Sequence, residues 1–443
     1  MEKIITRIGS ISAELDVFNL KDVLVKNDAG DWGDEPKEDA IGIIRSTNFT
    51  NEGKLNLKDV AYRNLKPNKR LEKKLFENEI LIERSGGSET QPVGRVGLVT
   101  NEIGRSDFAF ANFIQRIALN ETVAPTYVYY CLQQMYEMGV TRAMQYQTTG
   151  IRNLDWKLYI KSVLPKPPKP EQTAIATILS KLDEAIAATQ NSIKAAEKLK
   201  KSLMQNLLSG KLKPDGSWRT DDEFYVDEKF GKVPVGWEVA RVKDYGFVQT
   251  GKTPPTAESN VFSEIENELR YPFITPGDLG ESKYVSTSER FVTEKGIRYS
   301  YKLPINSICV VCIGSTIGKI GITKTEACTN QQINALIANE NNSGEFFFYM
   351  MEYRKPHFKE IAGINATPQI NKSGFIKYKL LRPKEKSEQE EIVSQLNSFD
   401  EENITKQSKI RTLQRLKKSL MQNLLTGKVR LDVEKVNNIL SEQ

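Results

Sequence analysis

The sequence is poor in the residues that many catalytic and metal sites need. Its 443 residues include one histidine, His357, and four cysteines, Cys131, Cys309, Cys312 and Cys328. Hydrolases that depend on a histidine base, and zinc sites that use pairs of histidines, are therefore poor fits to this chain. So few cysteines are typical of the reducing cytoplasm and not of a disulfide-bonded framework.

Long apolar runs are also missing. No charge-free apolar stretch reaches the roughly 18 residues of a membrane-spanning helix, and residues 1–7 lack the apolar stretch of a signal peptide. We therefore expect a cytoplasmic protein with no membrane partner. The sequence also lacks the Asn-Pro-Pro-Phe-like tetrapeptide and the glycine-rich loop of a methyltransferase, so we expect no cofactor site in this chain.

The overall composition is that of a globular protein. Hydrophobic residues make up 39% of the chain and charged residues 27%, and the length suggests about three structural units. The net charge of +6 permits a polyanionic partner but does not require one.

A long internal repeat is the clearest feature of the sequence. Leu199-Lys-Lys-Ser-Leu-Met-Gln-Asn-Leu-Leu208 recurs letter for letter at 416–425. The same offset of 217 aligns residues 171–211 with 388–428, where 20 of 41 positions are identical. Such a match indicates a duplication, which predicts two equivalent structural elements.

Each copy of the repeat has the pattern of a long helix. Apolar residues recur every three or four positions without an interrupting glycine or proline, as in a coiled coil. Gly210 and Gly427 follow the two runs, where helices usually end. The stripe predicted to form the coiled-coil or partner interface comprises Ile175, Leu179, Leu182, Ile186, Ile193, Leu199, Leu203, Leu207, Ile392, Leu396, Phe399, Ile410, Leu413, Leu416, Leu420 and Leu424.

Such a stripe could also be the core of a helix bundle. Two matching helices, each attached to its own preceding block, favour pairing of the two helices about a pseudo-two-fold axis. The blocks resemble each other more loosely: Val93-Gly-Arg-Val-Gly-Leu-Val99 corresponds to Ile317-Gly-Lys-Ile-Gly-Ile-Thr323. Both read as a strand with a glycine turn. We therefore predict an α+β protein in which each half is a mixed α/β block followed by one long helix.

Three motifs could carry chemistry, and each has a simpler explanation. Residues 246–253 satisfy the phosphate-loop formula, but Pro254 and Pro255 prevent the helix that must follow it. Cys309 and Cys312 have metal-ligand spacing but lie in a strand-like run, where their sulfur atoms point to opposite faces. The carboxylate and lysine cluster at 278–283 is too closely spaced for a nuclease site on neighbouring strands.

Binding chemistry remains. Polar and basic side chains gather around the glycine turns of both blocks, where Arg, Asn and Gln can read base edges while Ser, Thr and Lys hold phosphates. A solvated loop has a similar composition. The candidate DNA-binding residues are Arg84, Ser85, Ser88, Gln91, Arg95, Tyr146, Gln147, Thr148, Thr149, Arg152 and Asn153 in the first block, and Lys252, Thr253, Ser315, Thr316, Lys319, Gln331, Gln332, Asn365, Thr367, Gln369, Asn371 and Lys372 in the second.

Taken together, these motifs resemble one family over essentially the whole chain: the specificity subunit (HsdS) of type I restriction–modification enzymes. The junction Leu164-Pro-Lys-Pro-Pro-Lys-Pro-Glu-Gln172 is echoed by Leu381-Arg-Pro-Lys-Glu-Lys-Ser-Glu-Gln389, and the repeated tails 200–210 and 417–427 are equally typical. Val233-Pro-Val-Gly-Trp-Glu238 resembles the opening of the second recognition domain, whereas the first block has Leu15-Asp-Val17 in its place.

The resemblance implies a non-catalytic DNA-binding subunit. Each block would be a target recognition domain that reads half of an asymmetric bipartite DNA site, and the two helices would pack as an antiparallel coiled coil. Two modification subunits (HsdM) would supply S-adenosylmethionine and methylate adenine, and restriction subunits (HsdR) would use ATP and Mg. The expected divisions are recognition domain 1 (1–168), central helix (169–211), linker (212–232), recognition domain 2 (233–385), C-terminal helix (386–428) and tail (429–443).

Two other functions are kept as alternatives. One is a self-contained phosphate-loop NTPase or metal-dependent nuclease, which would need Lys252, Asp278 or Glu281. The other is a coiled-coil scaffold with no role in DNA binding.

Overall fold

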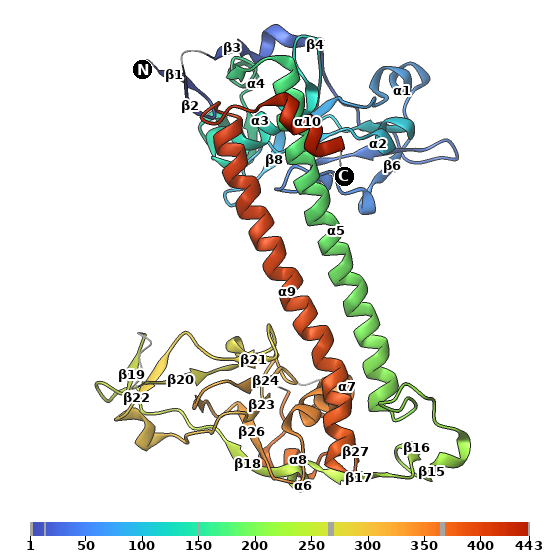
Figure 1. The fold of residues 1–443 in the computed structure, drawn as a ribbon, viewed down its shortest axis with the longest axis vertical. Helices are drawn as coiled ribbons and strands as arrows, with labels where there is room; N and C mark the ends of the chain where they lie inside the picture. The colour runs from blue at the N-terminus through green and yellow to red at the C-terminus, as the bar shows by residue number, and fades with distance from the viewer. Residues whose placement is uncertain (1–2, 13–14, 149, 265–269, 364–367, 442–443) are drawn as a thin grey trace. The chain divides into compact units, whose positions relative to one another are not determined.

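The chain divides into two units that share two long helices. The computed structural model describes residues 3–12, 15–148, 150–264, 270–363 and 368–441. Unit 1 comprises Met1–Gln190 and Ser408–Gln443, and unit 2 comprises Asn191–Gln407. Helices α5 (Lys169–Leu208) and α9 (Lys386–Leu424) each contribute to both units (Figure 1).

The block of unit 1 is built around an antiparallel four-stranded sheet. Its strand order is β4 (Leu24–Ala29), β11 (Ile114–Leu119), β7 (Ile80–Glu83) and β9 (Val96–Leu98). A second sheet has the order β10 (Phe108–Phe110), β5 (Ile41–Ile44) and β6 (Ala61–Arg63), and its β10–β5 pair is parallel. A third has the order β12 (Gln145–Thr148), β13 (Ile151–Leu154) and β8 (Ser85–Gly87).

The block of unit 2 repeats the strand order of the first two sheets of unit 1, with one additional edge strand in each. Its main sheet has the order β18 (Gly246–Thr250), β26 (Ile333–Ala338), β23 (Ile308–Val311), β24 (Ile320–Thr323) and β21 (Tyr284–Val285). The second sheet has the order β19 (Phe262–Ser263), β22 (Phe291–Thr293), β20 (Arg270–Ile274) and β25 (Cys328–Thr329), and its β20–β25 pair is parallel. The loose sequence similarity of the blocks therefore corresponds to one shared fold.

Each block also opens and closes with a paired strand, and it has one buried helix. In unit 1, β3 (Asp16–Asn19) pairs with β14 (Val163–Lys166), and in unit 2, β17 (Trp237–Arg241) pairs with β27 (Lys379–Pro383). The buried helices are α3 (Pro125–Glu137) and α7 (Gly344–Ile361). The departure of the first block from the Pro-x-Gly-Trp opening therefore leaves the opening strand intact.

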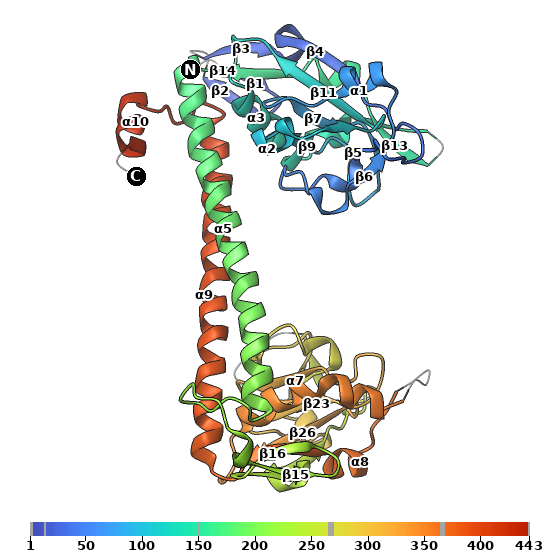
Figure 2. The same ribbon diagram turned by 90° about the vertical axis from the view of Figure 1, so that its right-hand side faces the viewer.

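Two-stranded hairpins precede the opening strands in both units. They are β1 (Lys3–Thr6) with β2 (Gly9–Ser12), and β15 (Phe224–Asp227) with β16 (Gly231–Pro234). The segment 212–232, expected to be an exposed linker, therefore contains ordered structure (Figure 2). The short helices are α1 (Pro67–Lys73), α2 (Asn101–Arg105), α4 (Trp156–Tyr159), α6 (Val242–Tyr245), α8 (Lys372–Lys377) and α10 (Val433–Ser441).

The long helices run antiparallel within each unit. In unit 1, Asp183 of α5 forms an ion pair with Lys417 of α9, and Glu171 at the start of α5 meets Arg430 just beyond the end of α9. In unit 2, Lys200 of α5 pairs with Asp400 of α9. The start of each helix therefore lies beside the end of the other, as the resemblance implied.

The apolar stripe differs from its prediction at one equivalent pair of positions. Leu199 is 58% exposed and Leu416 is 46% exposed, whereas the neighbouring Lys417 is only 8% exposed. The lysine that follows each leucine turns inward because it pairs with an aspartate of the other helix. Fully buried stripe residues are Ile175, Leu179, Ile186, Ile193, Leu207, Ile392, Leu396 and Leu424.

The Glu-Gln pair that begins each long helix joins the helix to its block. Gln172 accepts a hydrogen bond from the N–H of Ala124 (2.9 Å) and donates one to the carbonyl of Pro167 (2.8 Å). Gln389 accepts from the N–H of Ser343 (2.9 Å) and donates to the carbonyl of Pro383 (2.9 Å). Each amide therefore links the residue that caps the buried helix of its block to the proline that precedes the long helix.

The preceding glutamate is equally well bound. Burial alone would raise the pKa of Glu171, but hydrogen bonds from Arg430 and from the N–H of Leu431 outweigh burial and hold that pKa below its ordinary value. Glu388 accepts hydrogen bonds from Arg219 and from the indole of Trp237. In each unit the glutamate that begins one long helix therefore binds the segment that follows the other long helix.

A glycine ends each long helix for a steric reason. Gly210 has φ +71° and Gly427 has φ +66°, a conformation that L side chains rarely adopt. A Cβ at Gly210 would lie 2.2 Å from Pro234, and one at Gly427 would lie 1.9 Å from Leu15. Each helix therefore ends in close contact with the opening of the block in the same unit.

Replacing either glutamine should destabilise its unit. Gln172→Ala leaves the N–H of Ala124 and the carbonyl of Pro167 without partners, so we expect the free energy of unfolding to fall by about 2–4 kcal/mol. Gln389→Ala should have a similar effect. Urea unfolding followed by circular dichroism measures the change. Gln190→Ala and Gln407→Ala, at exposed positions of the same helices, are the controls, and equal stability of all four variants would contradict the assigned role.

Candidate nucleic-acid interface

In unit 1 the structure brings together the two segments expected to bind DNA. Strand β13 pairs with β12 on one side and with β8 on the other, so Arg152 lies opposite Gly87, and Asn153 lies opposite Ser85. The hydroxyl of Ser85 donates to the amide oxygen of Asn153 over 2.6 Å. These three strands form a small sheet that we call the first reading sheet.

Side chains on this sheet are available to a ligand. Tyr146 is 51% exposed and Ile151 is 43% exposed, and Gln147 and Ser88 are exposed as well. The amide of Gln147 can make paired hydrogen bonds to adenine, and an apolar group such as Ile151 can contact a thymine methyl. The predicted residue Thr149, and the side chain of Thr148, lie outside the described residues.

Two predicted residues of this unit, Arg84 and Gln91, bond to the protein itself. Arg84 donates to the amide oxygen of Gln115 (3.0 Å) and lies over the ring of Trp156. Gln91 donates to the side chain of Asn51 (3.1 Å). The polar groups of Arg84 and Gln91 are therefore directed to strand β11 and to the turn at Asn51, respectively.

Arg95 has a structural role instead of the predicted DNA contact. It is 7% exposed and forms a bidentate ion pair with Glu83, at 2.7 and 2.8 Å. It also donates to the carbonyls of Phe49 and Ser46. Arg95 stands just before β9, and its guanidinium is buried against Glu83 and the carbonyls of Phe49 and Ser46.

The predicted residues of unit 2 also converge. The N–H of Gly314 donates to the carbonyl of Pro368, and the N–H of Ile370 donates to that of Cys312. The N–H of Cys312 in turn donates to the carbonyl of Gln332. The turns at 314–319, 330–332 and 368–372 therefore lie together beside one end of the main sheet.

The turn after β18 joins this surface. The hydroxyl of Thr253 donates to the amide oxygen of Gln331 over 2.7 Å. Lys372 lies over the ring of Phe247, which is 62% exposed. Ser315, Gln331, Gln369, Asn371, Lys372, Lys252 and Thr253 are exposed and form what we call the second reading surface.

The remaining predicted residues of unit 2 are less accessible. Gln332 donates to the carbonyl of Ile313, Lys319 donates to that of Pro276, and Thr316 is half-buried. Asn365 and Thr367 lie outside the described residues. Sequence reasoning missed the exposed Ile151 and Phe247 because it collected only polar side chains, although both residues stand within the motifs that were singled out.

The structure gives the catalytic motifs other roles. No helix opens at Lys252 within the described chain, and the segment from Gly251 to Pro255 has no regular structure. Asp278 accepts hydrogen bonds from the N–H and hydroxyl of Thr275, so it caps a short 3-10 helix, η6 (Pro276–Asp278). Among the described residues, no group of three or more His, Cys, Asp or Glu side chains is placed to hold a metal ion.

The two cysteines of the Cys-x-x-Cys motif point into different hydrophobic clusters, as predicted for a strand. Burial raises the pKa of both the Cys309 and Cys312 thiols to about 12. They are therefore thiols at physiological pH and not thiolates.

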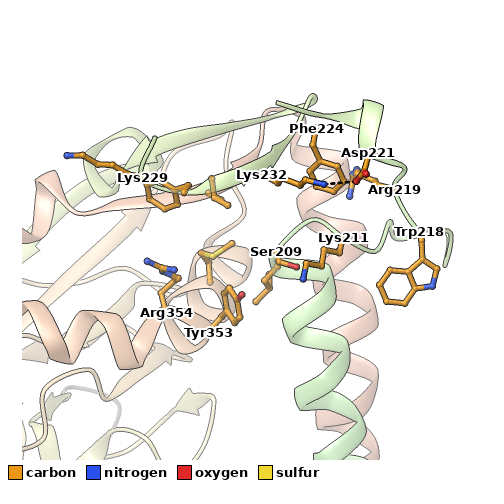
Figure 3. A pocket seen from close by; sticks show the side chains of 14 residues that line it. Ser209, Lys211, Trp218, Arg219, Asp221, Phe224, Lys229, Lys232, Tyr353 and Arg354 are labelled. Carbon is orange, nitrogen blue, oxygen red and sulfur yellow. Dashed lines mark hydrogen bonds and ion pairs between the residues drawn. The ribbon is translucent and has the colours of Figure 1, made fainter. Parts of the chain in front are cut away.

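A hollow of about 540 Å³ at the end of α5 in unit 2 is also lined by many basic side chains. Figure 3 shows Lys211, Lys229 and Arg354 around it, between the β15–β16 hairpin and α7. Lys232 is paired with Asp221 at 2.6 Å, and Arg219 with Glu388. None of the residues of the second reading surface lines this hollow, so it is a separate feature.

The comparisons with known proteins agree with this geometry. The model of the type I restriction–modification DNA specificity domain matches residues 13–198 and again 234–415. The chain therefore belongs to this family and carries its domain twice. It is a non-catalytic specificity subunit with two target recognition domains, and nothing found supports the NTPase or nuclease alternative.

Individual relatives match most of the chain. A putative type I restriction enzyme MjaX specificity subunit from Methanocaldococcus jannaschii is 23% identical, and the match covers 96% of each chain. The type I restriction enzyme MjaVIII specificity subunit of the same organism is 26% identical over 80% of each chain. The crystal structure of a type I restriction–modification S subunit from M. genitalium has a TM-score of 0.57 at 16% identity, covering 95% of this chain and 99% of that one, and therefore shares the fold.

No helix among the described residues is both long and apolar enough to cross a membrane.

The role of Arg95 can be tested through the pH dependence of stability. Burial raises the pKa of Glu83, and the hydrogen bonds and charge of Arg95 offset part of that rise. In Arg95→Ala the pKa of Glu83 rises further, so the folded chain holds a proton that the unfolded chain releases. Stability should fall by about 3–5 kcal/mol at about pH 8 and by much less at about pH 5.

Urea unfolding at both pH values measures this loss. The double variant Glu83→Gln with Arg95→Ala removes the titrating group, so its stability loss should not depend on pH in this range. A loss in Arg95→Ala that stays constant between the two pH values would contradict the buried ion pair.

Proposed function

We propose that the two reading surfaces each recognise one half of an asymmetric bipartite DNA site. The observation that carries the proposal is that both blocks, on one shared topology, collect exposed hydrogen-bonding side chains at equivalent glycine turns. The two sets differ in sequence, so two different half-sites are expected. In a type I enzyme this chain would then recognise the DNA sequence, while other subunits would carry out the chemical reactions.

The proposed contacts fall into two kinds. Gln147, Gln331 and Gln369 offer exposed amides for base edges, and Arg152 offers a guanidinium. Asn153 and Asn371 are further candidates, although their amides also bond to Ser85, Ile151 and Gly374. Ser85, Ser88, Thr253, Ser315, Lys252 and Lys372 suit phosphates, which position a protein without specifying sequence. Binding should therefore weaken steeply with salt, whereas a scaffold without a DNA role would show no such dependence.

The partners proposed for this chain are two modification subunits and, in the full complex, restriction subunits. S-adenosylmethionine would bind to the modification subunits, and ATP and Mg to the restriction subunits, in the cytoplasm. The duplicated helices support the number two. Leu199 and Leu416 stand 217 residues apart at equivalent positions, and both are exposed. Each offers one apolar contact for one copy of the same partner.

Base readout is tested by paired substitutions. Tyr146→Ala with Gln147→Ala should relax the first half-site, and Gln331→Ala with Gln369→Ala should relax the second. Loss of one bidentate contact reduces discrimination by about 1–3 kcal/mol, or roughly 5- to 150-fold. Methylation-aware sequencing of a host that expresses the variant with its modification subunit gives both half-sites in one measurement.

The matched controls are Gln422→Ala in unit 1 and Gln205→Ala in unit 2, at exposed and equivalent positions of the long helices. They should leave both half-sites unchanged. Exchange of residues 233–385 for the block of a relative should replace one half-site only. If both half-sites survive that exchange, the second block is not a reader and the proposal fails.

Partner docking is tested with the exposed leucines. Leu199→Asp should remove one modification subunit, and Leu199→Asp with Leu416→Asp should remove both, as measured by native mass spectrometry. Since both side chains are exposed, stability should change by no more than about 0.5 kcal/mol. By contrast, Leu203→Asp and Leu420→Asp, which pack against the block cores, should lower stability. Retention of two modification subunits by the double variant would refute this contact.

A further inference from the structure

A polar cluster recurs in both units where the buried helix of the block meets the two long helices. In unit 1, Asp183 binds Lys417 at 2.7 and 2.9 Å and accepts a hydrogen bond from the hydroxyl of Tyr130 at 2.8 Å. Each of these three residues comes from a different helix: α5, α9 and α3.

Unit 2 has the same arrangement with the two long helices exchanged. Asp400 of α9 binds Lys200 of α5 and accepts from the hydroxyl of Tyr349 of α7 at 2.6 Å. In both units the lysine also lies over the tyrosine ring, at 5.4 Å for Lys417 and 5.1 Å for Lys200.

A second lysine reaches each cluster from a loop of the block. Lys54 donates to the carbonyl of Asp183 at 3.4 Å, and Lys283 donates to the hydroxyl of Tyr349 at 3.1 Å. Each lysine follows a short 3-10 helix with a capping box, η2 (Ser46–Asn48) in unit 1 and η6 in unit 2. We call the four residues of each unit a clamp: Lys54, Tyr130, Asp183 and Lys417 in unit 1, and Lys200, Lys283, Tyr349 and Asp400 in unit 2.

The two lysine loops also contact the reading surfaces. In unit 1 the hydroxyl of Ser46 donates to the carbonyl of Ser85, and Asn51 accepts from Gln91. In unit 2 Lys319 donates to the carbonyl of Pro276, and the N–H of Ile322 donates to that of Lys283. One loop in each unit therefore connects the long helices to the turns that carry candidate DNA-binding residues.

The polar character of the clamp fixes geometry more than it adds stability. Tyr130 is 2% exposed, Tyr349 is 1% exposed and Lys417 is 8% exposed, so these groups lose most of their hydration. For buried ion pairs this loss largely offsets the attraction. Hydrogen bonds are directional, however, and they hold the block at one orientation where apolar packing alone would tolerate several.

We propose that the two clamps set the orientation of each reading surface on the paired helices, and thereby the spacer length that the protein accepts between its half-sites. Lys54, Lys283, Tyr130 and Tyr349 are positioning residues and make no contact with DNA. This inference rests on the proposed function, since it assumes that both surfaces read DNA.

The clamp of unit 2 has more partners and should control the spacer more strongly. Lys283 also donates to Asn397 and lies 3.2 Å from a carboxylate oxygen of Glu345, and Asn397 itself donates to Glu345. The residue equivalent to Asn397 in the repeat is Ser180, whose hydroxyl lies 3.2 Å from that of Tyr130. Lys54 is half-buried, and its bond to the carbonyl of Asp183 is longer.

The experiment measures the spacer length of methylated sites in a host that expresses each variant with its modification subunit. In Lys283→Met and in Tyr349→Phe, sites with one base pair more or less between unchanged half-sites should gain methylation about tenfold relative to the unaltered chain, as expected when one hydrogen bond to a charged group is lost. Lys54→Met should show the same change to a smaller extent. Lys201→Met and Lys418→Met, at exposed positions beside the clamp lysines, should keep the original spacer.

Two results would overturn the proposal: an unchanged spacer in the folded Lys283→Met and Tyr349→Phe chains, or relaxed half-site bases with the spacer unchanged. If Lys283→Met does not fold, the spacer length is measured with Lys54→Met instead. An unchanged spacer in that variant would equally contradict the proposal. Failure of the proposed function would be seen separately. Exchange of residues 233–385 would then leave both half-sites unchanged, whatever the spacer of the clamp variants.

Discussion

The antiparallel pairing of two duplicated helices is the constraint on which the rest of the structure depends. Each copy carries an aspartate near its start and a lysine near its end, at positions 183 and 200 in one and 400 and 417 in the other. Antiparallel pairing brings each aspartate to the lysine of the other copy. A parallel pair in register would instead place aspartate beside aspartate and lysine beside lysine, and like charges facing each other across an interface cost free energy. The duplication therefore encodes its own pairing direction.

The same constraint explains why two unlike blocks can share one frame. Each block rests on residues that come from both helices, and the contacts repeat although the blocks differ: the junction glutamine at 172 and 389, the terminal glycine at 210 and 427, and the clamp aspartate. These contacts involve the two long helices and their ends, together with the block residues that pack on them. The glycine turns take no part in them. The turns can therefore vary in sequence without disturbing the frame, which suits a surface that recognises DNA.

The sequence predicted the features that depend on local pattern. The repeat, the two long helices ending near Gly210 and Gly427, and the opposed cysteines all follow from periodicity or from residue spacing. The convergence of the glycine turns does not, because it depends on how the strands pair. It failed at Leu199 and Leu416, because a heptad pattern counts apolar residues and takes no account of a lysine that is buried by a distant aspartate. It also counted Arg95 among the accessible cations, because the motif does not reveal that Glu83 of a neighbouring strand pairs with Arg95 and buries it.

The clamp lysines show a deeper limit of sequence reasoning. Lys54 and Lys283 occupy equivalent places, yet the loops around them, 46–54 and 276–283, share little sequence. Their equivalence follows from the order of the strands and from the capped 3-10 helix that precedes each loop. Lys283 even stood in a triplet of charged residues that suggested a nuclease, whereas Asp278 caps a helix and Lys283 contacts α7 and α9. A cluster of charges in one segment therefore indicates chemistry only when its members meet each other, and here each meets a different part of the fold.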